Sequence, residues 1–123
     1  MSSLLLIAGP CVLEEERGAV EIAKTLRDIA ARQGVSFMFK ASFDKANRTS
    51  LGAYRGPGLD KGLRMLAAIR GAAGVRVMSD IHEPAQAAPA AVELDMLQIP
   101  AFLCRQTDLV VAAARTMKPL NLK

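Results

Sequence analysis

The sequence predicts an α/β fold in which helices cover a parallel sheet. Short, continuous apolar runs alternate with longer amphipathic segments along the whole chain. Strands buried on both faces have such continuous runs, and this is typical of parallel sheets. The chain has 123 residues, of which 51% are hydrophobic and 23% charged. That length and composition fit one modest globular domain with a buried core.

The first half of the chain predicts two strands separated by a helix and followed by a polar loop. Residues 4–8 and residues 35–41 are short apolar runs. Between them, residues 14–33 repeat apolar side chains at helical spacing, with three glutamates at the start and Gly34 after the end. The long polar loop then extends to Gly58. The apolar positions of the predicted helix are Val20, Ala23, Leu26, Ile29 and Ala30.

The second half of the chain predicts three more strands and three more helices. Pro84 suits the first turn of one helix, and Thr107 or Asp108 can cap another. Glycines at 71 and 74 can end the helix that begins at Leu59, in which leucine and isoleucine recur at helical spacing. The expected strands are residues 75–79, 96–99 and 120–123, and the expected helices are residues 59–71 or 59–74, 84–92 and 107–116.

Two architectures share this pattern, a doubly wound sheet and a (β/α)8 barrel, and the periodicity leaves both open. In both, chemistry gathers at the carboxyl ends of the strands. The polar residues of this chain follow that rule. They are Cys11 after the first strand, Lys40 to Arg48 after the second, Asp80 to Glu83 after the third, Arg105 after the fourth and Lys123 at the end of the fifth.

The loop after the second strand is rich in cations. Lys40, Lys45 and Arg48 surround one carboxylate, Asp44, and Asn47 adds a neutral hydrogen-bonding group. Phosphate and carboxylate ligands need fixed cations, and arginine offers a two-pronged contact. A solvated loop is the alternative, but Lys40 ends a run that is too apolar to be exposed. These residues therefore predict an anion site.

Two other positions could take part in chemistry. Asp80 and His82 lie in "SDIHEP", where the histidine could be an acid, a base, a metal ligand or a packing residue at a helix start. Cys11, in "AGPC", could be a metal ligand, although a lone cysteine is more often a small buried hydrophobe. Cys104 has less support as a functional residue.

Several classes of protein are excluded by composition and pattern. The net charge of +4 and pI of about 9.4 suit an anionic partner but are too small to indicate nucleic acid, and only 4% of residues are aromatic. No apolar run reaches the length of a membrane span. The start of the chain is interpreted as a strand and not as a signal. Two distant cysteines without a CxxC pair predict a reducing, cytoplasmic location.

The motifs "IAGPC", "FKASFDKANR", "YRGPGL", "SDIHEP", "QIPAFLCRQTDL" and "NLK" follow one another as they do in the 3-deoxy-D-manno-octulosonate 8-phosphate synthases. The chain resembles this family over its whole length. The resemblance implies a (β/α)8 barrel, a homo-oligomer (typically a tetramer), and an aldol-type condensation of phosphoenolpyruvate with D-arabinose 5-phosphate in lipopolysaccharide synthesis. "KANR" favours this family over the related 3-deoxy-heptulosonate 7-phosphate synthases, which carry a "KPRT"-like run.

The resemblance also implies roles for individual residues. Lys45, Asp80 and His82 are expected to be catalytic, with Asp80 also binding a hydroxyl of the substrate. Cys11 corresponds to the cysteine that binds a divalent metal ion in the metal-dependent class. The expected contacts of phosphoenolpyruvate are Lys40, Lys45, Arg105 and Lys123 with Gln98 nearby, those of the sugar phosphate are Asn47 and Arg48, and Pro100 and Ala101 line the same pocket.

Length is the one departure from this family. A complete barrel needs about 250 residues, so residues 1–123 are expected to form its first half, four β/α units plus the fifth strand. Further metal ligands and one more arginine are expected beyond residue 123. A truncated, non-catalytic chain that binds phosphorylated ligands or assembles with a second chain, and a simple phosphate-binding module, are the alternatives.

Overall fold

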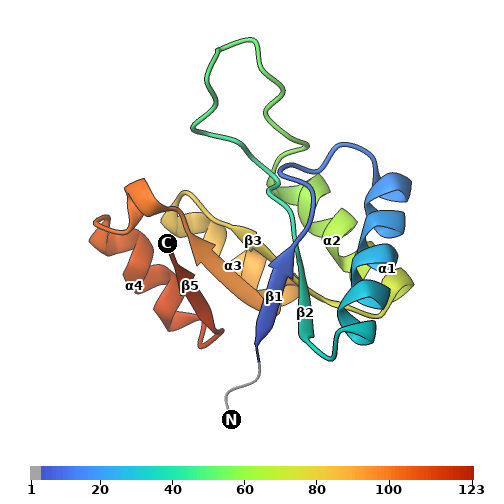
Figure 1. Cartoon of the computed structure of the whole chain (residues 1–123). Coiled ribbons are helices and arrows are strands. Elements are labelled where there is room, and N and C mark those ends of the chain that lie inside the picture. Colours follow the sequence, from blue (N-terminus) through green and yellow to red (C-terminus); the bar gives the residue numbers. More distant parts are fainter. Residues whose placement is uncertain (1–3) are drawn as a thin grey trace.

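The computed structural model describes residues 4–123, in which strands and helices alternate from one end to the other (Figure 1). The strands are short, with three to five residues each, while the longest helix has 17 residues. The strands are β1 (Leu5–Ala8), β2 (Ser36–Lys40), β3 (Arg76–Asp80), β4 (Met96–Ile99) and β5 (Leu120–Leu122), and the helices are α1 (Glu16–Arg32), α2 (Leu59–Ala73), α3 (Pro84–Glu93), the short 3-10 helix η1 (Ala101–Leu103) and α4 (Thr107–Arg115).

The five strands form one parallel sheet in the order β1-β2-β3-β4-β5. Each strand pairs with the strand that follows it in the sequence, and a helix connects each pair. The helices also contact one another in a row, α1 with α2, α2 with α3 and α3 with α4. The sheet curls, with the helices along its outer side (Figure 1). This is the arrangement of part of a (β/α)8 barrel, so the expected fold class is confirmed.

The hydrophobic core lies between the sheet and the helices. Phe39, Val77 and Leu97 belong to it and are fully buried, as are Leu66 and Ile69 of α2. Because side chains alternate between the two faces of a strand, the residues next to these core residues face the other side of the sheet. That second face, the inner face of the curl, is where the polar strand ends can meet.

Two helical predictions need correction. Ile29 was expected on the buried face of the first helix, but it is 40% exposed, and the nearby Ile22 is 41% exposed. Small alanines face the sheet instead, so α1 packs closely against it while its isoleucines lie to the side. In α4, neither Thr107 nor Asp108 is the N-cap: Gln106 takes that position, and its side chain makes no capping hydrogen bond.

Other element ends are close to expectation. α2 ends at Gly74, which has φ 64° in the left-handed region that glycine adopts without strain. Pro84 begins α3, and the side chains of Glu83 and Gln86 form a reciprocal capping box there. The third strand begins and ends one residue later than expected, at Arg76 and Asp80. Asp80 is therefore held by the sheet and is not part of a loop.

The connection between β2 and α2 projects from the end of the sheet as a long loop, green in Figure 1. The two arms of this loop are joined by hydrogen bonds at its base. The backbone N–H of Lys45 donates to the carbonyl of Arg55 at 2.6 Å, and that of Gly58 donates to Phe43 at 3.0 Å. The Arg55 guanidinium also pairs with the Asp44 carboxylate at 2.6 Å and 3.2 Å. The base of the loop is thus anchored over the strand ends.

Within residues 4–123, no helix is both long enough and apolar enough to span a lipid bilayer.

Candidate functional site

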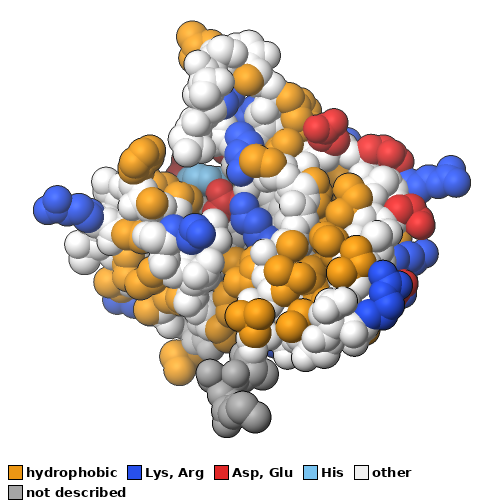
Figure 2. Space-filling model, in the orientation of Figure 1, with side chains coloured by type: hydrophobic (Ala, Val, Ile, Leu, Met, Phe, Trp, Pro, Cys, Tyr) orange, Lys and Arg blue, Asp and Glu red, His pale blue; other side chains and the backbone are white. Residues whose placement is uncertain are grey.

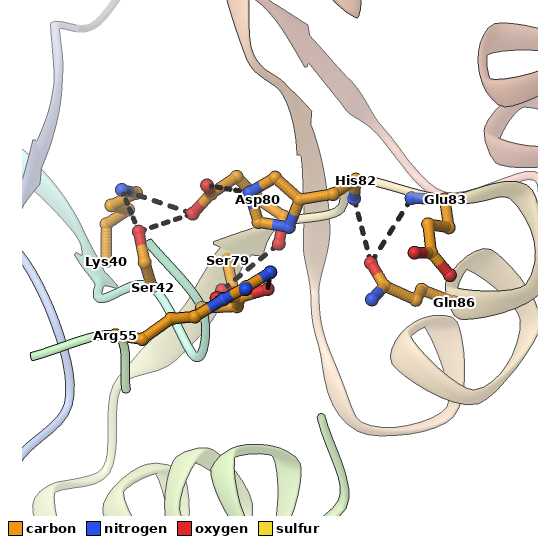
Figure 3. Close-up of polar contacts among 9 residues, drawn as sticks. Lys40, Ser42, Arg55, Ser79, Asp80, His82, Glu83 and Gln86 are labelled. Atoms are coloured by element: carbon orange, nitrogen blue, oxygen red, sulfur yellow. Dashed lines mark hydrogen bonds and ion pairs between the residues drawn. The ribbon is translucent and has the colours of Figure 1, made fainter. Parts of the chain in front are cut away.

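Four side chains meet on the inner face of the sheet where β2 and β3 end (Figure 3). The Lys40 ammonium lies 3.0 Å from the Ser42 hydroxyl oxygen and 3.4 Å from Asp80 Oδ1. Ser42 donates to the same Oδ1 at 2.5 Å. His82 Nε2 donates to the other carboxylate oxygen, Oδ2, at 2.9 Å. The Asp80 carboxylate is therefore held at both oxygens by three neighbours.

The parallel sheet explains why residues so far apart in the sequence meet. Lys40 is aligned with Met78 on the neighbouring strand, and Asp80 follows two residues later on the same face. Ser42 is likewise two residues beyond Lys40, held by hydrogen bonds between its backbone and the segment after β1. His82 is two residues beyond Asp80. The period of two in each segment places all four side chains on one side.

The charge of Asp80 is stabilised where it lies. Its side chain is only 8% exposed, and burial alone would raise its pKa. The hydrogen bond from His82, the positive charge of Lys40 and the hydrogen bond from Ser42 outweigh that effect, and they hold the pKa of Asp80 well below its usual range. The site therefore carries a fixed carboxylate next to a fixed ammonium.

His82 packs at the start of a helix, one of the alternatives that the sequence left open, and it also contacts Asp80. Its backbone N–H donates to the Gln86 side chain at 2.8 Å, so the residue helps to start α3. Its ring packs edge-on against Phe43, with centroids 6.1 Å apart and an angle of 87° between the planes. Nε2 contacts Asp80, while Nδ1 is buried without a hydrogen-bond partner among the described residues.

A small pocket of about 190 Å3 lies beside this cluster, between the base of the projecting loop and the segment after β4. Figure 2 shows the pale-blue histidine in a recess below the loop, with acidic and basic side chains next to it. Two predicted ligand-binding residues, Asn47 and Pro100, therefore share a pocket with His82. The residues that line it are Ala46, Asn47, His82, Pro100, Phe102 and Leu103.

A larger cavity of about 490 Å3 lies elsewhere, between α3 and α4. Four of its nine lining residues are alanines, and among the described residues that line it Arg115 and Lys118 are charged and none is a carboxylate or a histidine. The titratable cluster, and not the size of the cavity, therefore locates the candidate site.

Among residues 4–123, the remaining predicted site residues make no side-chain hydrogen bond or ion pair with the cluster. Gln98 is aligned with Asp80 across β3 and β4, and it accepts a hydrogen bond from Asn121 at 2.9 Å. Arg48 donates to the carbonyl of Leu51 within the projecting loop, at 3.4 Å and 3.5 Å. Three others, Ala101, Arg105 and Lys123, are exposed, and Lys45 is half-buried at the base of the loop.

The metal prediction finds little support in this part of the protein. Cys11 is exposed, and residues 4–123 contain no group of three or more histidine, cysteine, aspartate or glutamate side chains that could hold a metal ion. Cys11 can supply one thiolate ligand, but the described residues do not form a metal site by themselves.

Three residues of the site were not among the predicted ones. Ser42 bridges Lys40 and Asp80, and its position two residues after Lys40 was a usable signal, because alternate residues share a face. Phe43 packs against His82, and Asn121 fixes the Gln98 amide. Neither of these two contacts has a signal in the spacing of residues along the chain.

The curled parallel sheet, with a cluster of titratable side chains at its carboxyl edge, defines this chain as part of a (β/α) barrel. The chain matches the DAHP synthetase I family over residues 2–123 and belongs to that family. It is 61% identical over 120 residues to 2-dehydro-3-deoxyphosphooctonate aldolase of Desulfotalea psychrophila, covering 98% of this chain and 43% of the relative. The corresponding proteins of Desulfatibacillum aliphaticivorans and Campylobacter jejuni are 56% and 50% identical, over 98% and 100% of this chain and 44% and 46% of the relatives.

The chain therefore spans less than half the length of the curated relatives that it matches. The identity nevertheless extends over 98–100% of this chain.

Proposed function

We propose that this chain is the N-terminal half of a 2-dehydro-3-deoxyphosphooctonate aldolase, which condenses phosphoenolpyruvate with D-arabinose 5-phosphate and releases phosphate. The observation that carries the proposal is the buried Lys40–Ser42–Asp80–His82 cluster at the carboxyl edge of the sheet, in a chain with 61% identity to a protein of that name. Residues 1–123 would then be one continuous part of a single barrel domain.

The chemistry of the site agrees with two phosphorylated substrates. Each carries negative charge, so holding both in one pocket requires several cations, and positioning them side by side lowers the entropic barrier to their reaction. The Lys40 ammonium is fixed by Ser42 and Asp80 and is 19% exposed, so it can still present donors to an anion. The fixed carboxylate can accept a hydrogen bond from a sugar hydroxyl.

For the individual residues we propose the roles that the family resemblance implies. Lys40, Lys45, Arg105 and Lys123 bind phosphoenolpyruvate, with Gln98 beside them. Asn47 and Arg48 bind the phosphate end of the sugar, and the position of Asn47 in the His82 pocket supports this. Asp80 binds a sugar hydroxyl, Lys45 acts at the reacting centre, and Pro100 and Ala101 form the wall. Cys11 contributes one ligand of a divalent metal ion whose other ligands lie outside residues 4–123, and the whole protein is a homo-oligomer.

The test uses the longer gene product that contains this chain. Phosphate release from phosphoenolpyruvate is expected to require D-arabinose 5-phosphate, and release that required erythrose 4-phosphate instead would identify a 3-deoxy-heptulosonate 7-phosphate synthase. The Arg48→Ala variant should raise KM for the sugar phosphate more than KM for phosphoenolpyruvate. Arg17→Ala, on the exposed outer side of α1, is the matched control and should change neither. Equal effects of Arg48→Ala on both constants would refute its assignment.

The 123-residue chain should be assayed in parallel. We expect no turnover from it alone, because the relatives contain more than twice as much chain and a partial site gives little preorganisation. Turnover by this chain alone would refute that expectation. Binding of a phosphorylated ligand without turnover would instead support the alternative of a non-catalytic binding chain.

A further inference from the structure

His82 is the sole histidine of the chain, and its two ring nitrogens differ in their contacts. Nε2 lies 2.9 Å from Asp80 Oδ2. Nδ1 is buried and has no hydrogen-bond partner among residues 4–123. The ring edge rests against Phe43, and the backbone of His82 is fixed by the Gln86 side chain. The ring therefore packs against Phe43, and among residues 4–123 its one polar contact is the Asp80 carboxylate.

This geometry determines which nitrogen carries the proton. A carboxylate only accepts hydrogen bonds, so Nε2 must be the donor in the contact with Asp80. A proton on Nδ1 would be a buried donor without a partner, which is costly. The neutral tautomer with the proton on Nε2 satisfies the only available contact and leaves a bare acceptor at Nδ1. Nε2 is therefore the ring nitrogen that donates a hydrogen bond, and Asp80 accepts it.

The other two partners of Asp80 contact only one of its two carboxylate oxygens. Lys40 and Ser42 both contact Oδ1, so neither of them contacts Oδ2 directly. Without His82, Oδ2 would have no hydrogen-bond donor among residues 4–123, and only the two contacts at Oδ1 would oppose rotation of the carboxylate about its Cβ–Cγ bond. With His82, each oxygen has its own donor, and the carboxylate plane is fixed.

We propose that His82 is a positioning residue that acts through Asp80: its Nε2–H fixes the orientation of the Asp80 carboxylate so that this carboxylate can meet a hydroxyl of the sugar phosphate. His82 itself makes no contact with the reacting atoms. The inference deepens the proposed function and rests on it for the identity of the ligand, but the orientation of Asp80 and the tautomer of His82 can be tested without any turnover.

Two substitutions separate the two ring nitrogens. In His82→Gln the side-chain amide reaches the position of Nε2 and can still donate to Asp80. In His82→Asn the shorter side chain places its amide near Nδ1 and cannot. Both variants lose the edge contact with Phe43, so any loss that they share reports packing, and the difference between them reports the contact with Asp80.

In the longer gene product, His82→Asn is expected to raise KM for D-arabinose 5-phosphate about tenfold or more, as the loss of one charge-assisted hydrogen bond predicts, with KM for phosphoenolpyruvate unchanged. His82→Gln should remain within about threefold of the unsubstituted protein. In an Asp80→Asn background, His82→Asn should cause no further loss, because the group through which it acts is already altered. A His82→Asn variant that outperforms His82→Gln, or additive losses in the double variant, would overturn the proposal.

A second measurement is independent of activity. Because the chain has one histidine, selective nitrogen-15 labelling gives a single pair of imidazole signals in the 123-residue protein. The spectrum should show the tautomer protonated at Nε2, and Asp80→Asn should perturb those signals. The tautomer protonated at Nδ1 would overturn the inference. If the spectrum agrees and the longer product has no synthase activity, the substrate assignment is wrong and the positioning contact stands.

Discussion

Gly62 offers a direct test of how tightly α2 supports the candidate site. A Cβ added at this position would lie 2.3 Å from the Cβ of Phe43 and 3.3 Å from its Cα, well inside the 3.4 Å at which ordinary van der Waals contact begins. Phe43 is fully buried and packs against His82. A Gly62→Ala substitution would therefore push the helix away from the segment that carries the site.

The same helix contains a matched control. At Gly71 an added Cβ would meet nothing within 4 Å. Alanine is favoured over glycine in a helix by about 1 kcal/mol, and this gain is common to both variants. The difference between their free energies of unfolding therefore isolates the steric cost of the contact with Phe43, which should be about 1–3 kcal/mol, the usual range for overpacking in a core.

Urea unfolding monitored by far-ultraviolet circular dichroism measures this difference. Gly71→Ala should be more stable than the unsubstituted chain, and Gly62→Ala should be less stable than Gly71→Ala by the amount given above. The histidine signals should also shift in Gly62→Ala and stay in place in Gly71→Ala. Equal stabilities for the two variants would show that Phe43 yields freely, and would refute the idea that α2 braces the site.

Two further predictions concern charged side chains. Because the pKa of Asp80 in the folded chain lies below its unfolded value near 3.8, its stabilising effect is complete above that pH and is lost as the pH falls below it. Asp80→Asn should therefore flatten the fall in urea midpoint below about pH 4, and an unchanged acid slope in that range would contradict this. Asp95 accepts a hydrogen bond from the backbone N–H of buried Val77 at 2.8 Å, so Asp95→Ala should cost about 1–3 kcal/mol of unfolding free energy in the same urea assay. Glu93→Ala is the comparison, because it removes only a half-exposed ion pair with Arg70 at 3.9 Å. It should cost about 0–1 kcal/mol. Equal costs for these two alanine variants would refute the distinction.

Much of the fold could be predicted because local sequence and tertiary structure agree. The strands are apolar enough to be buried, and Gly74 and Pro84 mark helix ends through backbone geometry that few other residues satisfy. The errors arose where tertiary packing decides the outcome. Ile29 has the right spacing for a buried helix face, but the small side chains of α1 are the ones that lie against the sheet.

The site could be predicted as a set of residues but not as a geometry. The rule that parallel strands bring their carboxyl ends together correctly placed Lys40 and Asp80 near each other. It could not identify Ser42 as their bridge, since a serine at a strand end has many possible partners. It also could not show whether His82 only packs at the helix start or also contacts Asp80, because the answer depends on the distance from Nε2 to that carboxylate.

The sequential order of the strands has a consequence for the newly made chain. Every pairing in the sheet joins a strand to the one made just before it, so the sheet can grow in the order of synthesis, without waiting for distant segments. The polar cluster cannot form strand by strand in this way. Ser42 and Asp80 are 38 residues apart, and until the third strand leaves the ribosome and docks, Lys40 has no counter-ion. The docking of Asp80 is thus the step at which the emerging chain gives the half-buried Lys40 ammonium its carboxylate partner.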